Sequence, residues 1–162
     1  MISNFVLSLL SLSLGAIPLA SSQSTFSPSV PEAQPRTKIY TPKTFNTTNT
    51  NTTFTGSVYQ TIIHSSNETS IAHVLFTPSA RTYWHTHEEG QILYITSGHG
   101  WIAELGEEPR RIAEGDVIFA PPGTTHWHGA DRGSLMGHFV VGLGGARWAG
   151  PVGEGEYPGG RS

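Results

Sequence analysis

The residues that decide the fold are Tyr-Trp-His-Thr-His-Glu-Glu-Gly-Gln, at positions 83–91. His85 and His87 are two positions apart, so on a β-strand both imidazoles project from the same face. A turn of two prolines and a glycine leads, farther along the chain, to His126. If the strands that carry these residues are neighbours, three imidazoles and the side-chain oxygen of Gln91 can close on one divalent ion.

This set of ligands predicts a catalytic metal site. Imidazole nitrogen suits zinc, iron, manganese and nickel. Three histidines and one glutamine are uncharged when bound, so the ion keeps its double charge and is a stronger Lewis acid than it would be beside a carboxylate. An octahedral ion with four protein ligands retains about two open positions for water or substrate, which is typical of a catalytic site.

Around these residues, short runs of β-branched and aromatic residues alternate with Gly and Pro turns. Strands separated by turns in this way indicate an all-β sandwich or barrel, and no segment shows a sustained helical period. We predict a turn at 97–100 and irregular structure on the outside of the protein from Gly145 onwards. The predicted strands are 58–63, 71–77, 83–87, 91–96, 101–105, 110–112, 117–120, 127–129 and 136–142.

The alternation along these strands predicts a barrel interior that is mostly apolar but contains a group of His and Gln side chains, as in a ligand pocket. We expect His64 and His73 not to bind metal, because no motif surrounds them. Glu88 and Glu89 lie between the ligand strands, where we expect them to be solvated. The predicted inward-facing residues are Ala72, Val74, Phe76, Tyr83, His85, His87, Gln91, Leu93, Ile95, His126, His128, His138, Val140 and Gly142.

Composition excludes several other classes of protein. The 162 residues suffice for one domain, and 12 acidic against 9 basic residues give a formal net charge of -3. That balance gives no electrostatic reason to expect binding to nucleic acid or to acidic membranes. The chain has no Cys, so disulfides, thiolate catalysis and Cys-type zinc sites are excluded.

The N-terminal third predicts export from the cell. Residues 1–22 contain an apolar, Leu-rich run followed by small residues, as in a cleavable secretory leader, and we expect no membrane anchor once it is removed. Residues 23–55 are polar and predict a disordered or extended arm. N-glycosylation motifs begin at Asn46, Asn51 and Asn67. The folded domain is predicted over 56–157, with a flexible tail at 158–162.

Two segments resemble the two motifs of the cupin family. The first comprises 81–87 with Gln91 and Gly98, and the second runs from Gly115 to His126. The resemblance covers about 54–157. It implies a single-domain jelly-roll β-barrel, often a homodimer, with a manganese, iron or zinc ion held by His85, His87, Gln91 and His126.

Within the family the chain is most similar to small bacterial cupins of the manganese-dependent hydroxynitrile lyase type, which favours manganese. Many cupins have Glu at the fourth ligand position, whereas this subgroup and this chain have Gln. The same resemblance places Thr82, His128 and His138 near the ion, and Ala72 and Val74 along the substrate pocket. Gly142 falls at a pocket position where those lyases have Gln, a departure that bears on cyanohydrin chemistry.

These features predict a secreted enzyme that acts on a small organic molecule. His128, helped by His138, would move a proton in a lyase, decarboxylase or isomerase reaction, since an unperturbed imidazole titrates near pH ~6.5. A simpler role for His128 is to position a ligand by hydrogen bonding. Two alternatives for the whole protein remain: an iron-dependent dioxygenase, and a non-catalytic cupin that binds a small molecule or a sugar.

Overall fold

The computed structural model describes residues 46–47 and 53–158, all of which belong to one compact unit over 38–162. The predicted leader, most of the predicted arm and all but the first residue of the predicted tail lie outside the described residues. Among the described residues, no helix is long and apolar enough to cross a membrane.

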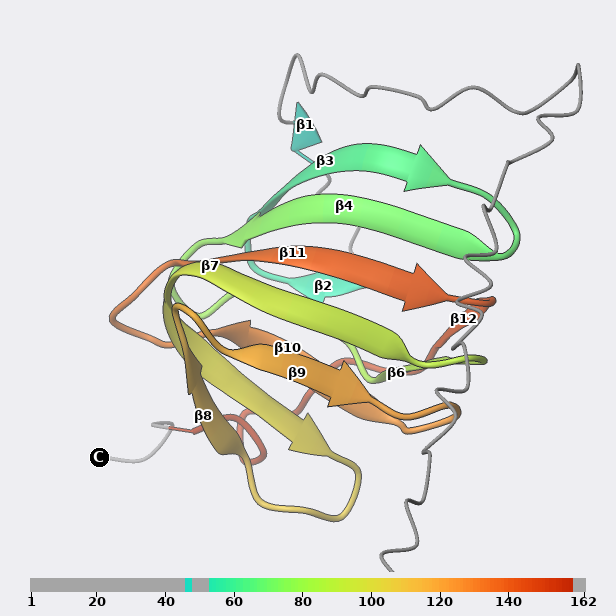
Figure 1. Ribbon diagram of the computed structural model, residues 1–162. Helices are drawn as coiled ribbons and strands as arrows, with labels where there is room; N and C mark the ends of the chain where they lie inside the picture. Colours follow the sequence, from blue (N-terminus) through green and yellow to red (C-terminus); the bar gives the residue numbers. More distant parts are fainter. Residues whose placement is uncertain (1–45, 48–52, 159–162) are drawn as a thin grey trace, which may run out of the picture. The chain divides into compact units, whose positions relative to one another are not determined.

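Every regular element of the described chain is a β-strand, and the pairings are antiparallel, which confirms the all-β prediction (Figure 1). The strands are β1 (Asn46–Thr47), β2 (Phe54–Thr55), β3 (Val58–Ser65), β4 (Thr69–Phe76), β5 (Arg81–Thr82), β6 (His85–His87), β7 (Gln91–Glu104), β8 (Arg110–Ala113), β9 (Val117–Ala120), β10 (His126–Ala130), β11 (Met136–Leu143) and β12 (Ala146–Trp148). Two of the described strands, β1 and β2, precede residue 56, where the folded domain was predicted to start.

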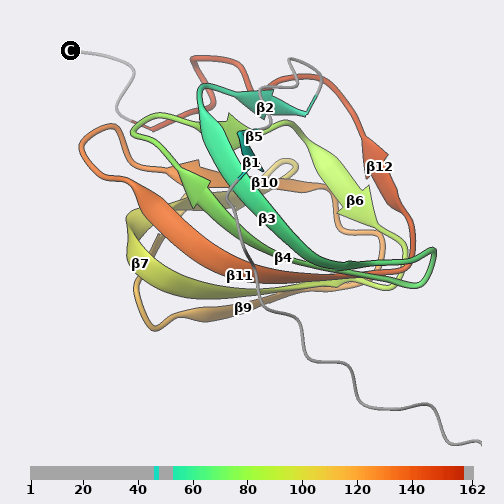
Figure 2. The same ribbon diagram turned by 90° about the horizontal axis from the view of Figure 1, so that it is seen from above.

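The strands form two walls of a nearly closed jelly-roll barrel, as predicted. One wall contains β3, β4, β11, the first half of β7, and β9. The other contains β2, β5, β10, β6, β12 and the second half of β7. Figure 2 shows the two walls facing each other. The main core cluster fills the space between them, with Phe76, Leu93, Ile95 and Met136 fully buried.

The predicted turn at 97–100 is wrong, because these residues lie inside the long strand β7. The first half of β7 pairs with β11 and β9, and the second half pairs with β10 and β8. Gly98 lies where the strand passes from one wall to the other and has a φ of 68°. A Cβ at this position would lie 1.9 Å from the carbonyl oxygen of Leu135. The glycine therefore permits a bend within a strand rather than a reversal of the chain.

The segment after Gly145 also differs from the prediction. Ala146–Trp148 forms β12, which pairs with the ligand strand β6. Beyond it, Tyr157 is only 2% exposed, and its hydroxyl donates to the carbonyl of Ala130. The segment from β12 to Tyr157 is therefore integrated into the fold, although its glycine-rich sequence shows no strand alternation.

Salt bridges and cation–π contacts fix this C-terminal segment to the barrel. The guanidinium groups of Arg81 and Arg132 lie over the Tyr157 ring, 4.4 Å and 4.8 Å from its centroid. Both also bind the carboxylate of Glu154, at 2.7 Å and 3.1 Å. Trp127 is fully buried in the second core cluster, and Trp84 and Trp101 pack against this cluster.

Candidate metal centre and its cavity

The four predicted metal ligands lie together at one end of the barrel interior. His85 and His87 lie on β6, Gln91 begins β7 and His126 begins β10. Antiparallel pairing of β6 with β10 places His126 opposite His85, and their ring centroids are 4.3 Å apart. All four side chains belong to buried residues. Side chains two positions apart on a strand share a face, so His85 and His87 both point inward, as predicted.

Backbone carbonyls determine which nitrogen of two histidines faces the centre. Nδ1 of His85 is 3.0 Å from the Tyr83 carbonyl oxygen, and Nδ1 of His126 is 3.0 Å from that of Thr124. A carbonyl oxygen only accepts, so each Nδ1 carries the hydrogen and donates it. Each Nε2 therefore keeps its lone pair, the form in which imidazole binds a metal.

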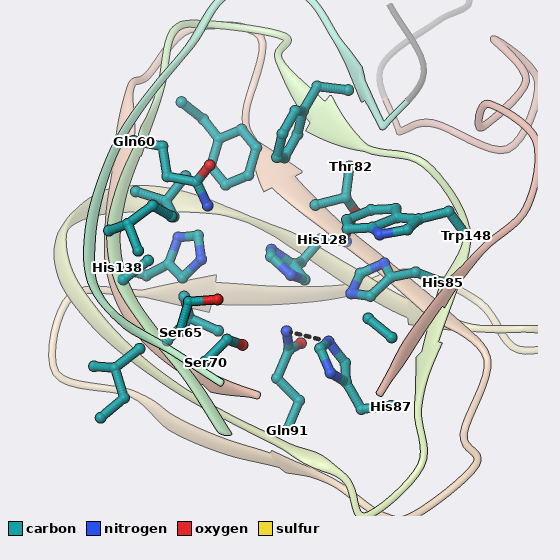
Figure 3. A pocket seen from close by; sticks show the side chains of 18 of the residues that line it. Gln60, Ser65, Ser70, Thr82, His85, His87, Gln91, His128, His138 and Trp148 are labelled. Atoms are coloured by element: carbon teal, nitrogen blue, oxygen red, sulfur yellow. Dashed lines mark hydrogen bonds between the residues drawn. The ribbon is translucent and has the colours of Figure 1, made fainter. Parts of the chain in front are cut away.

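The Gln91 carboxamide lies between His87 and His126. Its Nε2 is 2.8 Å from Nε2 of His87 (Figure 3), and its Oε1 is 2.9 Å from Nε2 of His126. Since Nε2 of His126 has a lone pair, this second contact joins two acceptors. A cation bound by both Oε1 of Gln91 and Nε2 of His126 would replace this unfavourable contact with two favourable interactions. The four predicted ligands therefore fit a divalent ion.

Burial keeps these imidazoles uncharged. Burial, followed by the neighbouring His126, lowers the pKa of His85 to about 3 and that of His87 to about 4. The pKa of His126 is also lowered, chiefly by burial. All three rings are neutral near pH 7, so no proton has to leave before a metal binds.

His128 lies beside the predicted ligands, and its protonation differs from the expectation. One nitrogen from each of His85, His126 and His128 lies within 4.8 Å of the others, so geometry alone also permits His128 as a third ligand. Burial, with a further contribution from His138, lowers the pKa of His128 well below its usual value. The pKa of an unperturbed imidazole therefore does not apply to His128, because an enclosed imidazolium would lose its solvation.

An uncharged cavity of about 150 Å³ opens onto the centre. The predicted pocket residues Ala72, Val74 and Thr82 line it. His64, which we expected not to bind metal, also lines it. The hydroxyl oxygen of Thr82 accepts the backbone N–H of His128 at 3.1 Å, which leaves its own hydrogen free for a ligand. The cavity is lined by Phe54, Gln60, Ile62, His64, Ser65, Ser70, Ile71, Ala72, Val74, Phe76, Thr82, His85, His87, Gln91, His128, His138, Val140, Ala146 and Trp148.

Gly142, predicted to line the pocket, instead lies against His87, one of the predicted metal ligands. A Cβ on Gly142 would lie 2.7 Å from Cε1 of His87 and 2.6 Å from Oγ of Ser70. Because Gly142 has no side chain, the His87 ring can lie directly against its backbone. A side chain at 142 could reach the cavity only by displacing that ring.

Sequence reasoning missed two aromatic residues of this site. Trp148 on β12 stacks on His85 with ring centroids 4.7 Å apart and an interplanar angle of 26°. Phe54 on β2 contacts Trp148 edge-on at 6.0 Å. Both come from strands of two or three residues, which are too short to give an alternation signal, and only pairing with β6 and β5 reveals them.

Comparisons with known proteins agree with this architecture. The Cupin domain family model matches residues 72–141. A cupin-like protein from Thermotoga maritima is 34% identical, with 75% of this chain and 95% of that chain covered and a TM-score of 0.65. A polyketide cyclase from Streptomyces resistomycificus shares the fold at 14% identity, with coverage of 73% and 87% and a TM-score of 0.59.

A curated relative matches over a shorter segment. The (R)-mandelonitrile lyase of Granulicella tundricola is 50% identical over 46 residues, which are 28% of this chain and 35% of that protein. The match therefore spans about a third of the relative. The family match, the coverage of the Thermotoga protein and the barrel together establish that this chain belongs to the cupin family.

Proposed function

We propose that this protein is a secreted, metal-dependent lyase that acts on a small organic molecule. One observation carries the proposal. Four uncharged, buried donor side chains converge at the end of a cavity without charged lining residues, and the neutral imidazoles of His128 and His138 line the same cavity. Proton transfer beside a Lewis acid is the chemistry that these groups can perform.

We assign the metal to His85, His87, Gln91 and His126, and we favour manganese over iron or zinc. A divalent ion there would polarise a substrate oxygen and stabilise negative charge on it. The assignment prefers His87 to His128 as the third histidine, because His87 and His126 both have Nε2 directed at the Gln91 amide.

The remaining polar groups of the cavity supply proton transfer. Nδ1 of His128 and Nδ1 of His138 are buried and make no hydrogen bond within the described structure. In a lyase reaction, neutral His128 takes the proton of a substrate hydroxyl. At the same time, the bond between the carbon that bears this hydroxyl and the leaving group breaks. A carbonyl forms, the leaving group departs with the bonding electrons, and His128 returns the proton to it. Thr82 can orient the substrate oxygen by donating its hydroxyl hydrogen.

His138 is placed to support His128. Their rings are 4.9 Å apart at an interplanar angle of 85°. Burial lowers the pKa of His138 to about 3, with a smaller contribution from His73. A neutral His138 does not repel a proton that arrives on His128, which fits a lyase. The same proton transfer would serve a decarboxylase or an isomerase, and the segment that matches the mandelonitrile lyase favours the lyase class.

The test combines metal analysis with a variant at His128. We expect one divalent ion per chain and release of an aldehyde or ketone from 2-hydroxynitriles or related hydroxylated substrates, without oxygen uptake. His128→Ala should lower turnover by a factor of about 10² to 10⁴ and retain the metal. His64→Ala, which changes a cavity-lining histidine with no proposed role as ligand or base, is the matched control. Full turnover in His128→Ala would exclude its acid–base role, and oxygen uptake would favour the dioxygenase.

We also propose that two copies associate through the outer face of the wall that contains β7 and β9. Ile92 pairs with Phe119, and Tyr94 pairs with Val117. All four side chains are between 37% and 69% exposed. These four residues, here called the outer apolar patch, form a contiguous surface of the kind that marks an interface. A second copy suits it, because a two-fold interface pairs such a patch with itself.

The proposal that the protein is secreted rests on the sequence of residues 1–22 and on Asn67. Asn67 lies in the exposed turn between β3 and β4, where a glycan would meet no obstacle from the barrel. Expression in a eukaryotic secretory host should give a mature protein that starts near residue 23. Treatment with an N-glycosidase should reduce its mass.

A further inference from the structure

Arg81 is a buried positive charge that contacts the C-terminal segment of the chain. Its side chain is only 4% exposed. The guanidinium donates to the carbonyl oxygen of Val152 at 3.2 Å and to the carboxylate of Glu154 at 2.7 Å. It also lies over the ring of Tyr157. We call Val152, Glu154 and Tyr157 the C-terminal clasp.

These contacts contribute more to position than to stability. Glu154 is 71% exposed, so water screens its attraction for the guanidinium. Nε of Arg81 is buried and makes no hydrogen bond within the described residues. Removing a guanidinium from water offsets much of the free energy that its contacts return. Its planar shape nevertheless fixes the direction of each hydrogen bond, and therefore the place of Arg81.

We propose that Arg81 is a positioning residue, which holds Thr82 in place from outside the cavity. Arg81 and Thr82 are consecutive on β5, so their side chains project from opposite faces. Thr82 lines the cavity beside His128 (Figure 3), whereas Arg81 points to the C-terminal clasp. The inference rests on the proposed function, in which Thr82 orients the substrate oxygen and His128 transfers the proton.

β5 depends on this support because its own pairing is slight. The strand has two residues and pairs with β10 at one position, where Arg81 is opposite Gly129. A Cβ on Gly129 would lie 2.6 Å from Cα of Arg81, so the two backbones are in direct contact there. A displacement of Arg81 therefore moves Thr82 relative to His128, the neighbour of Gly129 on β10.

The clasp holds both of the strands that meet at this point. The hydroxyl of Tyr157 donates to the carbonyl of Ala130, the last residue of β10. The N–H of Ala130 donates to the carbonyl of Ala80 at 2.9 Å. On the cavity side, the N–H of His128 donates to Oγ1 of Thr82 at 3.1 Å. The separation of β5 and β10 therefore determines both this hydrogen bond and the direction in which the Thr82 hydroxyl offers its hydrogen.

Arg81→Lys tests the inference in the full-length protein, because lysine keeps the charge and loses the planar fork. Amide hydrogen exchange, followed by NMR, is the readout that needs no substrate. We expect the N–H of His128 to exchange about tenfold faster in Arg81→Lys, whereas the N–H of Leu93, on the other wall of the barrel, keeps its rate. A purely structural role would accelerate both amides together and overturn the inference.

A double-mutant cycle with Thr82→Val supplies the second readout, which is turnover of a 2-hydroxynitrile by the metal-loaded protein. Arg81→Lys should lower kcat about tenfold, because a small displacement of an orienting group slows the reaction strongly. In a Thr82→Val background it should have no further effect, since the group through which it acts is gone. An equal loss in both backgrounds would show that Arg81 does not act through Thr82.

Arg132→Lys is the matched control. Arg132 binds the same carboxylate of Glu154 at 3.1 Å and lies over the same Tyr157 ring, but its side chain is 38% exposed and it does not lie on β5. It should change neither readout. If Arg81→Lys fails to fold, Glu154→Gln removes the carboxylate partner at an exposed position, and it should also accelerate exchange at His128.

The two readouts separate this inference from the proposed function. A protein without turnover, in which Arg81→Lys still accelerates exchange at His128 and not at Leu93, would overturn the enzymatic proposal and keep the hold of Arg81 on Thr82. Turnover in the wild type, with exchange at His128 unchanged in both Arg81→Lys and Glu154→Gln, would overturn this inference and keep the enzymatic proposal.

Discussion

Oε1 of Gln91 and Nε2 of His126 face each other at 2.9 Å, although both are acceptors. The carbonyl of Thr124 holds the only hydrogen of the neutral His126 ring on the opposite nitrogen. A proton on Nε2 could relieve the contact, but burial disfavours the imidazolium. A divalent cation would relieve it with the amide in this orientation, and a half-turn of the amide would relieve it without a cation. Gln91 is therefore the most informative ligand to change.

Gln91→Glu should bind the divalent ion at least about tenfold more tightly, because a carboxylate adds a full negative charge opposite the metal. The same charge weakens the Lewis acid, so turnover should fall while metal occupancy rises. Competition with a chelator measures the affinity. Glu88→Gln, in the exposed loop between the ligand strands, is the control and should change neither quantity. Unaltered affinity in Gln91→Glu would remove Gln91 from the ligand set.

Gly142→Ala should weaken metal binding. The new Cβ would lie 2.7 Å from Cε1 of His87 and 2.6 Å from Oγ of Ser70. Ser70 can rotate away, but the ring must move, so we expect a loss of about 1–3 kcal/mol in stability as well as reduced affinity. Gly150→Ala, with no atom within 4 Å of the new Cβ, is the matched control. Calorimetric titration with Mn²⁺ and urea unfolding check both effects, and normal affinity in Gly142→Ala would show that His87 does not bind the metal.

The metal-free protein should lose stability as the pH falls below about 6.5. Burial lowers the pKa of His85 and of His138 to about 3, from 6.5 in the unfolded chain. Between these values the unfolded state binds protons that the folded state does not, so acid favours unfolding. Each such histidine contributes up to about 1.4 kcal/mol per pH unit. Urea midpoints at about pH 7.5, 6.5 and 5.5 measure the slope, and His138→Phe should reduce it. A urea midpoint that does not change with pH would contradict the burial of neutral histidines.

Tyr94→Lys should yield monomers if the outer apolar patch is the dimer interface. A lysine in the centre of a buried apolar contact would leave an unpaired charge without water. Light scattering after gel filtration gives the mass in solution. Leu105→Lys is the control, because Leu105 is 66% exposed but lies outside the patch. A dimer that survives Tyr94→Lys would place the interface elsewhere, and a monomeric wild type would exclude it.

The sequence was most informative where alternation along a strand was strong. The spacing of His85 and His87 and the turn before His126 predicted the meeting of the ligands. The alternation in β4 predicted that Ala72 and Val74 face the barrel interior. These are local rules, since the side-chain period of a strand fixes which residues share a face.

Other features depended on contacts that local rules do not determine. Gly98 resembles a turn residue in the sequence, and only the pairing of β7 with both walls shows that it bends a strand. The pKa of His128 depends on complete enclosure by residues from several strands. Trp148 lies in a glycine-rich segment without alternation, and its role follows from the pairing of β12 with β6.

The pairing of β6 with both β10 and β12 has a consequence for biosynthesis. His85 and His87 leave the ribosome long before the residues at 126 and 146–148 that flank their strand. A nascent chain therefore cannot present the finished centre before residues 146–148 have emerged, and a metal ion held at this centre would be acquired only after that point. If the chain is exported unfolded, the metal supply of the compartment it reaches, rather than that of the cytosol, would decide which ion it carries.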